Sequence, residues 1–282
     1  MKVDGHSLVL GIIGDPVKHS FSPLLHNAFA EAEGVNTVYV PFPVKREDIE
    51  AAVRGAYALG IQGLNVTVPH KEAVIPYLTD IDPMAAEIGA VNCLVRTDGG
   101  YKGYNTDALG FIRTLELIGA DVKGKECVML GAGGAANAVL HALLNSGAQK
   151  VWVLNRSADK AKSKFGHIDK VEVLSMDEYG KIPEGGLFCA QCTSVGLSPD
   201  VEKSPIADPA FFKRIEKAVD IIYSPEKTRF MALAEENGCA IVNGINMLIY
   251  QAVEAYKLFT GHSVSVNGID RAKEIINGAS HT

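Results

Sequence analysis

Residues 64–73, LNVTVPHKEA, bring small polar side chains and a lysine close together in the chain. The alternation of apolar and polar residues up to Val68 predicts a strand with one buried apolar face. Asn65 and Thr67 then face the other way, into a cleft. A proline ends this strand because it cannot donate to a ladder, and Lys71 turns in from the next helix. A lysine at this position is either the solvated start of a helix or a group that handles a proton.

A second stretch with chemical potential is GAGGAA at 131–136, which follows an apolar strand and opens a helical stretch. It has the form G-x-G-x-x-A, in which Gly131 allows a tight turn and Gly133 allows a pyrophosphate to approach closely. Ala136 lets the helix pack against the strand, and the N–H groups at the helix start face the phosphates. The motif predicts a dinucleotide site, and the alternative is a turn that serves packing only.

The strand after the glycine motif indicates which dinucleotide is bound. It ends in Asn155, Arg156 and Ser157, with Lys160 shortly after. An NAD site would carry an acidic residue about here to hold the ribose 2′-hydroxyl. A guanidinium can instead bind a 2′-phosphate through two hydrogen bonds. We therefore expect NADP rather than NAD, although Lys160 and Lys164 could also form the solvated face of a helix.

Composition excludes several classes of function. The chain has 282 residues, 47% hydrophobic and 21% charged, which is typical of globular proteins. Its formal net charge of −6 argues against a general nucleic-acid binder. The N-terminus lacks the pattern of a secretory signal, and no apolar run of about 20 residues could span a membrane. We expect a cytoplasmic protein with neither nucleic-acid nor membrane partners.

The cysteines and histidines add no further site. The five cysteines are scattered and do not suggest a disulfide framework. Cys189 and Cys192 form a C-x-x-C at the end of an expected strand, which argues against a redox pair or a metal site. No metal is expected. His19, His26 and His70 could act as general bases, but nothing in the sequence fixes a partner for any of them, so we assign them structural roles.

The elements that position these residues alternate between short apolar strands and helical stretches. In the first part of the chain we expect strands at 8–14, 37–44, 63–69 and 91–97, and helices at 22–34, 47–60 and 70–78. The stretch DGGYKG after the last of these strands reads as a hairpin turn. This βαβ rhythm predicts an α/β fold with a mostly parallel sheet.

A second α/β series begins near residue 125. Its helix at 135–147 ends at Gly147, the expected position for a C-terminal glycine. Further strands are expected at 150–157, 186–196, 218–225 and 239–244, and the chain closes with an amphipathic helix at 246–261. We predict two α/β lobes with a cleft between them, connected by that helix and a helix at 107–119. Residues 1–104 plus 246–282 form the substrate-binding and catalytic domain, and residues 105–245 form a Rossmann-type domain that binds NADP.

Oxidation of an alcohol by a nicotinamide cofactor also needs a group that accepts the hydroxyl proton. Outside the dinucleotide lobe the candidates lie in HSFSPLLHN (19–27), NVTVPHKE (65–72), GAVNC (89–93) and GYNTDALGF (103–111). Together with GAGGA, NRS, DIIYSPEKT (220–228) and GINMLIYQA (244–252), this set closely resembles the shikimate dehydrogenase family. The motifs occur in the order typical of the family from about residue 8 to 261, and they are specific as a set although each alone is modest.

The resemblance implies reversible, NADPH-dependent reduction of 3-dehydroshikimate to shikimate in chorismate and aromatic amino acid biosynthesis. It implies that Lys71 and Asp107 are the catalytic pair. The residues implied to bind substrate are Ser20, Ser22, Asn65, Thr67, Asn92, Tyr223 and Gln251. Those implied to contact the cofactor are Gly131, Ala132, Gly133, Gly134, Ala135, Asn155, Arg156, Ser157, Lys160, Thr193, Ile221, Gly244 and Met247.

Several of these residues also have structural interpretations. Ser22 precedes Pro23, which is the arrangement of a helix N-cap followed by N1. Asp107 lies in Asn-Thr-Asp, which also reads as a helix cap. Tyr223 could be an aromatic residue at a strand end, and Gln251 could face solvent. The spacing of Gln251 from the apolar stripe of its helix favours an inward position.

The protonation state of Lys71 is open at this stage. A free lysine is charged at neutral pH, and a nearby Asp107 favours the charged form further. Two mechanisms therefore remain: a neutral, desolvated Lys71 acts as the base, or a charged Lys71 polarises the oxygen while Asp107 passes the proton.

The chain departs from the family pattern in two places. Gln191-Cys192-Thr193 stands where Asn-Ala-Thr is usual, which puts in doubt how this loop meets the cofactor, and Ala108 replaces a common glycine. One rival is a quinate/shikimate dehydrogenase with broader substrate or NAD use. Another is a nucleotide-sensing protein that catalyses nothing. We expect a small-molecule substrate and a monomer or homodimer.

Overall fold

The computed structural model describes residues 3–279, and its chain divides into two compact units. Unit 1 comprises Met1–Gly110 and Ile249–Thr282, and unit 2 comprises Phe111–Leu248. The divisions fall within helices α4 (Thr106–Leu117) and α9 (Ile245–Thr260). Residues 1–2 and 280–282, at the ends of the predicted substrate-binding domain, lie outside the described residues.

Unit 1 is built on a six-stranded sheet in the order β2-β1-β3-β5-β6-β4. Apart from its parts of α4 and α9, the elements of unit 1 are β1 (Leu8–Gly14), α1 (Ser22–Glu33), β2 (Thr37–Pro43), η1 (Arg46–Asp48), α2 (Ile49–Ala58), β3 (Gly63–Val66), η2 (Ile75–Tyr77), β4 (Asp80–Ile81), α3 (Pro83–Ile88), β5 (Cys93–Thr97), β6 (Gly100–Tyr104) and α10 (Val266–Ala279). The sheet is mostly parallel, but β5 runs antiparallel to both β3 and β6. The antiparallel pairing of β5 with β6 confirms the expected hairpin, whose turn contains Gly99 at φ +99°.

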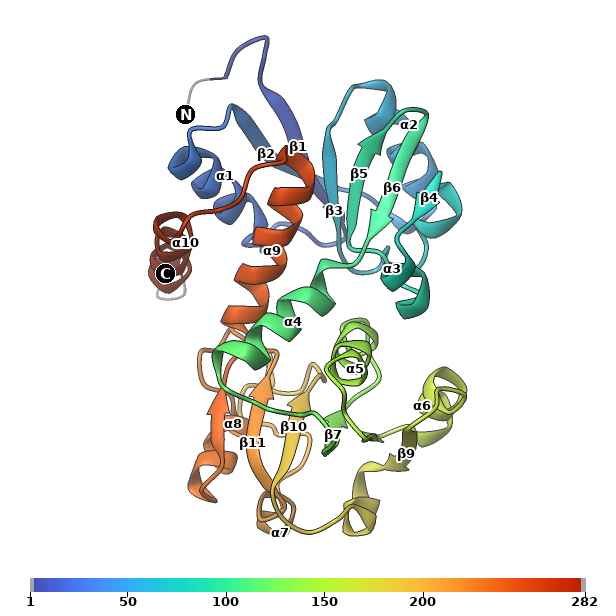
Figure 1. Ribbon diagram of the computed structural model, residues 1–282, viewed down its shortest axis with the longest axis vertical. Coiled ribbons are helices and arrows are strands. Elements are labelled where there is room, and N and C mark those ends of the chain that lie inside the picture. Colours follow the sequence, from blue (N-terminus) through green and yellow to red (C-terminus); the bar gives the residue numbers. More distant parts are fainter. Residues whose placement is uncertain (1–2, 280–282) are drawn as a thin grey trace. The chain divides into compact units, whose positions relative to one another are not determined.

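Unit 2 contains a six-stranded sheet that is parallel throughout (Figure 1). Apart from its parts of α4 and α9, the elements of unit 2 are β7 (Glu126–Leu130), α5 (Ala136–Asn145), β8 (Lys150–Asn155), α6 (Ala158–Phe165), β9 (Val171–Ser175), η3 (Met176–Lys181), β10 (Leu187–Gln191), α7 (Pro209–Phe212), β11 (Ile215–Asp220), α8 (Arg229–Glu236) and β12 (Ala240–Val242). Read from β9 to β12, the spatial order is 3-2-1-4-5-6 in the chain order of the strands. This is the order of a Rossmann fold, so the predicted fold class, with two α/β lobes, is confirmed.

The two sheets are held by separate apolar cores. In unit 1 one cluster includes Val53, Leu64 and Tyr101, and a second includes Leu10 and Phe259. In unit 2 the cluster takes alternate residues of β7, β8 and β10, so it lies on one face of the sheet. It contains Val128, Leu130, Leu154, Phe211 and Phe230, all fully buried.

The strand before the lysine is shorter and more deeply buried than the alternation predicts. β3 ends at Val66, and Val68, expected in the core, is 60% exposed. Asn65, expected on the polar face of the strand, is only 4% exposed. The reason is that β3 lies inside the sheet, between β1 and β5, and elements pack on both of its faces. Leu64 packs with Val53 of α2, and on the other face Gly63 lies against Phe259 of α9.

Lys71 lies in a turn rather than on a helix, which corrects the prediction for 70–78. A single helical turn forms, in which the N–H of Val74 donates to the carbonyl of His70 at 2.9 Å. Pro76 has no N–H with which to continue the ladder, so the chain tightens into the 3-10 helix η2. Lys71 therefore lies in a short turn between β3 and η2, and not in a helix.

Further helices follow where the sequence pattern was weak. The helix at 246–261 is not the last, because α10 follows it and packs on α1, with Arg271 bonded to Glu31 at 2.6 Å (Figure 1). The short helices α3 and α7 each begin with a capping aspartate followed by proline: Asp82 accepts from the N–H of Met84, and Asp208 from that of Ala210. Both carry standard start signals.

Candidate active site

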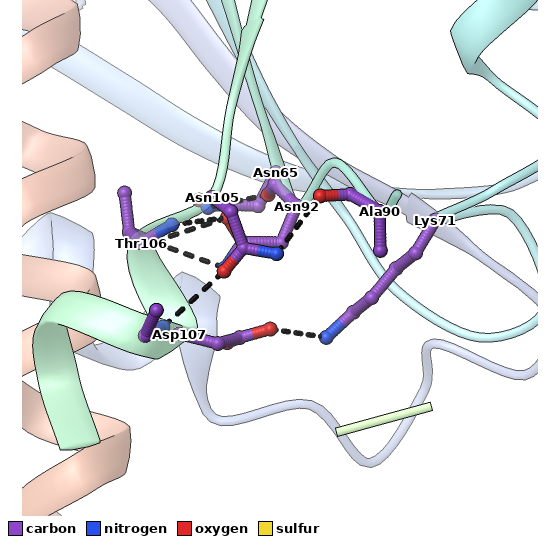
Figure 2. A network of polar contacts seen from close by, with 8 residues as sticks. Asn65, Lys71, Ala90, Asn92, Asn105, Thr106 and Asp107 are labelled. Carbon is purple, nitrogen blue, oxygen red and sulfur yellow. Dashed lines mark hydrogen bonds and ion pairs between the residues drawn. The ribbon is translucent and has the colours of Figure 1, made fainter. Parts of the chain in front are cut away.

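The two predicted catalytic residues, Lys71 and Asp107, are in direct contact within unit 1. The Lys71 Nζ donates to the Asp107 Oδ2 at 2.6 Å (Figure 2). The two side chains are 18% and 12% exposed, so the pair is largely shielded but still reachable by solvent. The backbone carbonyl of Lys71 accepts from the N–H of Val91 at 2.8 Å, which ties the lysine turn to the segment before β5.

Asp107 is free to meet the lysine because Asn105 caps helix α4. The Asn105 Oδ1 accepts from the N–H of Ala108 at 3.2 Å, and its Nδ2 donates to the carbonyl of Ala90 at 2.9 Å (Figure 2). The capping role considered for Asp107 therefore falls to Asn105. Since Ala90 is next to Val91, the same segment holds both the lysine turn and the start of α4.

Two buried amides, those of Asn65 and Asn92, lie beside this pair (Figure 2). The Asn92 Oδ1 accepts from the backbone N–H of Thr106 at 2.7 Å, and its Nδ2 donates to the Thr106 Oγ1 at 3.0 Å. The Asn65 Nδ2 donates to the backbone carbonyl of Asn92 at 3.2 Å. Unit 1 therefore brings an ammonium, a carboxylate and two fixed amides together, a set suited to binding hydroxyl groups and moving a proton.

The two predicted serines lie at the start of α1. Phe21, not Ser22, occupies the N-cap position and no side-chain cap forms, so the expected capping role of Ser22 is wrong. Instead the backbone N–H of Ser22 donates to the Ser20 Oγ at 3.2 Å. Thr67 follows β3 and is half-buried, and a Cβ at Gly14 would approach its Cγ2 to 2.3 Å, which explains the glycine there.

The remaining two predicted substrate residues belong to different units. Tyr223 lies after β11 in unit 2, where burial raises the pKa of its phenol. Gln251 lies on the part of α9 that belongs to unit 1. Both are half-buried, so Gln251 is not the fully solvent-facing residue that its structural interpretation allows.

The glycine motif forms the turn between β7 and α5 in unit 2, as its sequence context predicts. Gly131 has φ +100°, and a Cβ there would lie 2.8 Å from the Thr193 Cγ2. A Cβ on Gly134 would meet nothing within 4 Å, and one on Gly133 would meet only the carbonyl oxygen of Cys192 at 3.9 Å. Gly131 is thus required by its neighbours and its conformation, whereas the next two glycines leave backbone open to a ligand such as a pyrophosphate.

The end of β8 carries exposed positive charge. The Asn155 Nδ2 donates to the carbonyl of Ser157 at 2.9 Å, which shapes the turn that presents Arg156. Arg156 and Lys160 are exposed, as a contact to a 2′-phosphate requires. Lys164 lies in the next turn of α6 and is half-buried.

Lys164 is less solvated than expected because it contacts the glycine turn. Its Nζ lies 3.4 Å from the carbonyl oxygens of both Ala132 and Gly133. This contact neutralises carbonyl dipoles on the loop and leaves the loop N–H groups available to an anion. The donor set of this region, open backbone amides with Arg156 and Lys160 nearby in sequence, fits NADP.

The other predicted cofactor residues are placed by tight backbone contacts after β10 and β11. A Cβ at Gly244 would lie 2.0 Å from the carbonyl oxygen of Ile221, and the N–H of Gly244 donates to the carbonyl of Ile222 at 3.1 Å. Met247 is 7% exposed on the unit 2 part of α9. The N–H of Thr193 donates to the Gln191 Oε1 at 2.5 Å.

Gln191, which departs from the family pattern, belongs to a buried network that the sequence did not reveal. The Asp220 carboxylate accepts from the Thr228 hydroxyl at 2.6 Å, the Ile222 N–H at 3.0 Å and the Gln191 Nε2 at 3.3 Å. Burial, the largest cause, raises the pKa of Asp220 to about 6. The network joins the loop that contains Thr193 to the segment after β11.

The histidines and cysteines stay outside this chemistry. The His70 Nε2 lies 2.6 Å from the carbonyl oxygen of Val44, so it carries the hydrogen and donates. Cys189 lies within β10, and Cys192 is the first residue after that strand. Both are free thiols and buried, and burial raises the pKa of each. Within residues 3–279 no cluster of histidine, cysteine and acidic side chains could hold a metal ion. No helix in that range is long and apolar enough to cross a membrane.

Comparison with known families matches most of the chain. Residues 12–94 match the shikimate dehydrogenase substrate binding domain, and residues 114–184 match the shikimate / quinate 5-dehydrogenase family. Residues 244–272 match the shikimate 5′-dehydrogenase C-terminal domain. The three matches follow the chain in order.

Individual relatives extend this similarity over nearly the full length. The shikimate dehydrogenase (NADP(+)) of Moorella thermoacetica is 41% identical over 288 aligned residues, which cover 99% of this chain and 97% of the relative. A shikimate 5-dehydrogenase from Listeria monocytogenes, solved with shikimate and NAD, superposes with a TM-score of 0.88 at 28% identity, covering 98% of each chain. The Thermus thermophilus enzyme, solved with NADP(H) and shikimate, superposes with a TM-score of 0.83 at 32% identity, covering 95% of this chain and 99% of that one.

Proposed function

Because the chain belongs to the shikimate dehydrogenase family, we propose that it reduces 3-dehydroshikimate to shikimate reversibly with NADPH, as a step of chorismate biosynthesis. It is an NADP-dependent oxidoreductase that acts on a CH–OH group. The observation that carries the proposal is the Lys71–Asp107 pair, held at 2.6 Å beside the buried amides of Asn65 and Asn92. A protein that only senses a dinucleotide has no need for this arrangement.

Lys71 and Asp107 are the proposed catalytic groups. The Lys71 Nζ lies 2.6 Å from the Asp107 carboxylate, and a negative charge this close favours the ammonium form of the lysine in the ligand-free protein. In the reducing direction the Lys71 ammonium donates a proton to the carbonyl oxygen of 3-dehydroshikimate as that oxygen becomes a hydroxyl. In the oxidising direction the Lys71 ammonium first releases a proton to solvent, and the neutral amine then takes the hydroxyl proton while Asp107 stabilises the ammonium that results.

The substrate's other groups are assigned to the polar side chains around this pair. Ser20 and Ser22 bind the carboxylate at the start of α1, where a helix N-terminus also favours an anion. The residues proposed to bind the ring hydroxyls or the carboxylate are Asn65, Thr67, Asn92, Tyr223 and Gln251. The N–H bonds that Asn65 and Asn92 make to other residues of unit 1 leave each amide nitrogen a second N–H for a ligand.

Unit 2 is the proposed NADP-binding domain, and unit 1 the proposed substrate-binding domain. The bound nicotinamide supplies or accepts the hydride. The backbone of 131–135 binds the pyrophosphate, while Arg156 and Lys160, with Asn155 and Ser157 shaping their turn, bind the 2′-phosphate. Thr193, Ile221 and Gly244 also contact the cofactor, and Met247 lies near the nicotinamide.

The proposal is tested by incubating the purified chain with shikimate or quinate and with NADP⁺ or NAD⁺, while NADPH or NADH formation is followed by absorbance. We expect the highest kcat/KM for shikimate with NADP⁺. Comparable kcat/KM for quinate, or for NAD⁺, would instead identify the broader quinate/shikimate enzyme. If neither polyol reduces either cofactor, the chain is not a dehydrogenase of this class. The cytoplasmic location and the monomeric or homodimeric state stay predictions.

A further inference from the structure

Tyr39 is a fully buried residue next to the proposed substrate-binding side chains, and it has no role in the proposed mechanism. It lies on β2, the edge strand of the unit 1 sheet. Asn27 of α1 completes the free edge there: its Oδ1 accepts from the N–H of Tyr39 and its Nδ2 donates to the carbonyl of Tyr39, both at 2.9 Å. The Tyr39 ring stacks on that of His26, with centroids 4.3 Å apart and planes 8° apart. Backbone and ring are therefore both fixed.

The hydroxyl of Tyr39 contacts the Asn65 carboxamide, and the direction of this hydrogen bond can be worked out. The Asn65 Nδ2 faces the backbone carbonyl of Asn92, which can only accept. The Asn65 Oδ1 therefore faces Tyr39, at 2.8 Å from the Tyr39 Oη, and the phenol must donate. Burial holds the pKa of Tyr39 well above its ordinary value, so the phenol keeps its proton.

We propose that Tyr39 is a positioning residue for substrate recognition, which fixes the Asn65 carboxamide so that its second N–H is directed at a ring hydroxyl of the substrate. The inference rests on the proposed function, in which Asn65 binds shikimate. Without the phenol hydroxyl, the buried Asn65 Oδ1 loses its donor, and the amide is held by one hydrogen bond, to the carbonyl of Asn92, instead of two. Ordering that amide then costs binding free energy each time shikimate binds. Proton transfer by Lys71 is unaffected, because Tyr39 contacts neither Lys71 nor Asp107 through any hydrogen bond of the described residues.

The test compares Tyr39→Phe with Tyr101→Phe, a matched control in the same unit. Tyr101 is also buried, and its hydroxyl makes one hydrogen bond, to the carbonyl of Ile61 at 2.7 Å, away from the proposed site. Steady-state kinetics give KM and kcat, and calorimetry gives the Kd for shikimate. We expect Tyr39→Phe to raise the KM and Kd for shikimate about threefold to tenfold, the effect of one buried hydrogen bond. The KM for NADP⁺ and the kcat stay within about twofold of the wild type, and Tyr101→Phe changes none of these values.

A double-mutant cycle with Asn65→Ala shows whether Tyr39 acts through Asn65. In the Asn65→Ala background, Tyr39→Phe should have no further effect on the Kd for shikimate. An undiminished effect there overturns the inference, as does an equal rise in KM in the Tyr39→Phe and Tyr101→Phe variants. If the wild type neither binds nor oxidises shikimate, the proposed function itself fails. If the wild type is active and Tyr39→Phe leaves the KM for shikimate unchanged, only the role of Tyr39 fails.

Discussion

At the scale of single residues, the chemistry of this protein depends on contacts that sequence spacing does not show. Lys71 and Asp107 are 36 positions apart, yet they meet because the lysine turn and the start of α4 are both bonded to residues 90–91. The residue types could be recognised as an acid–base set from the sequence. The sequence could not show that Asn105 rather than Asp107 caps the helix, because neighbouring cap candidates differ only in the direction of their side chains.

Replacing Lys71 by alanine should remove the proton-transfer group. We expect kcat for shikimate oxidation to fall by about 10² to 10⁴-fold, the usual contribution of one general acid or base. The Kd for shikimate should change far less, since the amides and serines remain. The matched control is Lys102→Ala, which breaks another lysine–aspartate pair of unit 1, with Asp80 at 2.8 Å, on the surface. Turnover that survives Lys71→Ala would contradict both mechanisms considered for the lysine.

Arg156 is expected to determine the choice of cofactor. In Arg156→Asp the new carboxylate repels the 2′-phosphate of NADP and can hold the free 2′-hydroxyl of NAD. The ratio of kcat/KM for NADP⁺ to that for NAD⁺ should fall about 10- to 100-fold, since a charge-assisted hydrogen bond is lost. Lys162→Asp is the control, because Lys162 is exposed on α6 and the change in net charge is identical. An equal shift in both variants would show that overall charge, not a contact, sets the preference.

At the scale of elements, the periodicity of the sequence predicted most strands and the helices that follow them. What it missed was decided by tertiary neighbours. The burial of Asn65 depends on the position of β3 between β1 and β5 and on α2 and α9, which pack on the two faces of the strand. The turn at Lys71 depends on the missing N–H of Pro76, a signal that was present in the sequence. The capping aspartates Asp82 and Asp208 were also readable, but their helices are too short to show an apolar period.

The turn that precedes α5 provides a test of an element rather than of a side chain. Gly131→Ala places a Cβ in a left-handed conformation, which costs about 1–2 kcal/mol, and brings it within 2.8 Å of the Thr193 Cγ2. We expect a lower Tm and weaker NADP binding, because the loop of Thr193 must move. Gly180→Ala is the control, since a Cβ there meets nothing within 4 Å. Calorimetry of NADP⁺ binding and thermal unfolding would measure both effects, and unchanged NADP affinity in Gly131→Ala would argue against a cofactor role for this turn.

At the scale of the whole molecule, two buried ionisable groups give stability opposite dependences on pH. Burial lowers the pKa of His26 in unit 1 to about 3, and neither ring nitrogen has a hydrogen-bond partner among the described residues. In the unfolded chain His26 has its ordinary pKa of 6.5, so below about pH 6.5 the unfolded state binds a proton that the folded state does not bind. His26 therefore lowers the stability of the folded state as the pH falls below about 6.5. Asp220 in unit 2 has its pKa raised to about 6, from 3.8. Here the folded state binds the proton first, so stability is gained as the pH falls from above 6 towards 3.8.

The two contributions therefore partly cancel between about pH 6 and pH 4, and removing either one should uncover the other. Asp220→Asn removes the stability that protonation of Asp220 adds at low pH. As the pH falls, the free energy of unfolding of this variant should therefore decrease more steeply than that of the wild type, by a few kcal/mol over this range. His26→Phe deletes the loss, so the same curve should flatten or rise towards acid. Urea unfolding at a series of pH values, followed by circular dichroism, measures both slopes. Because each variant is compared with the wild type at every pH, a uniform loss of stability from altered packing leaves the slope unchanged. Parallel curves for all three proteins would mean that neither group is held in the buried, unpaired state from which these slopes follow.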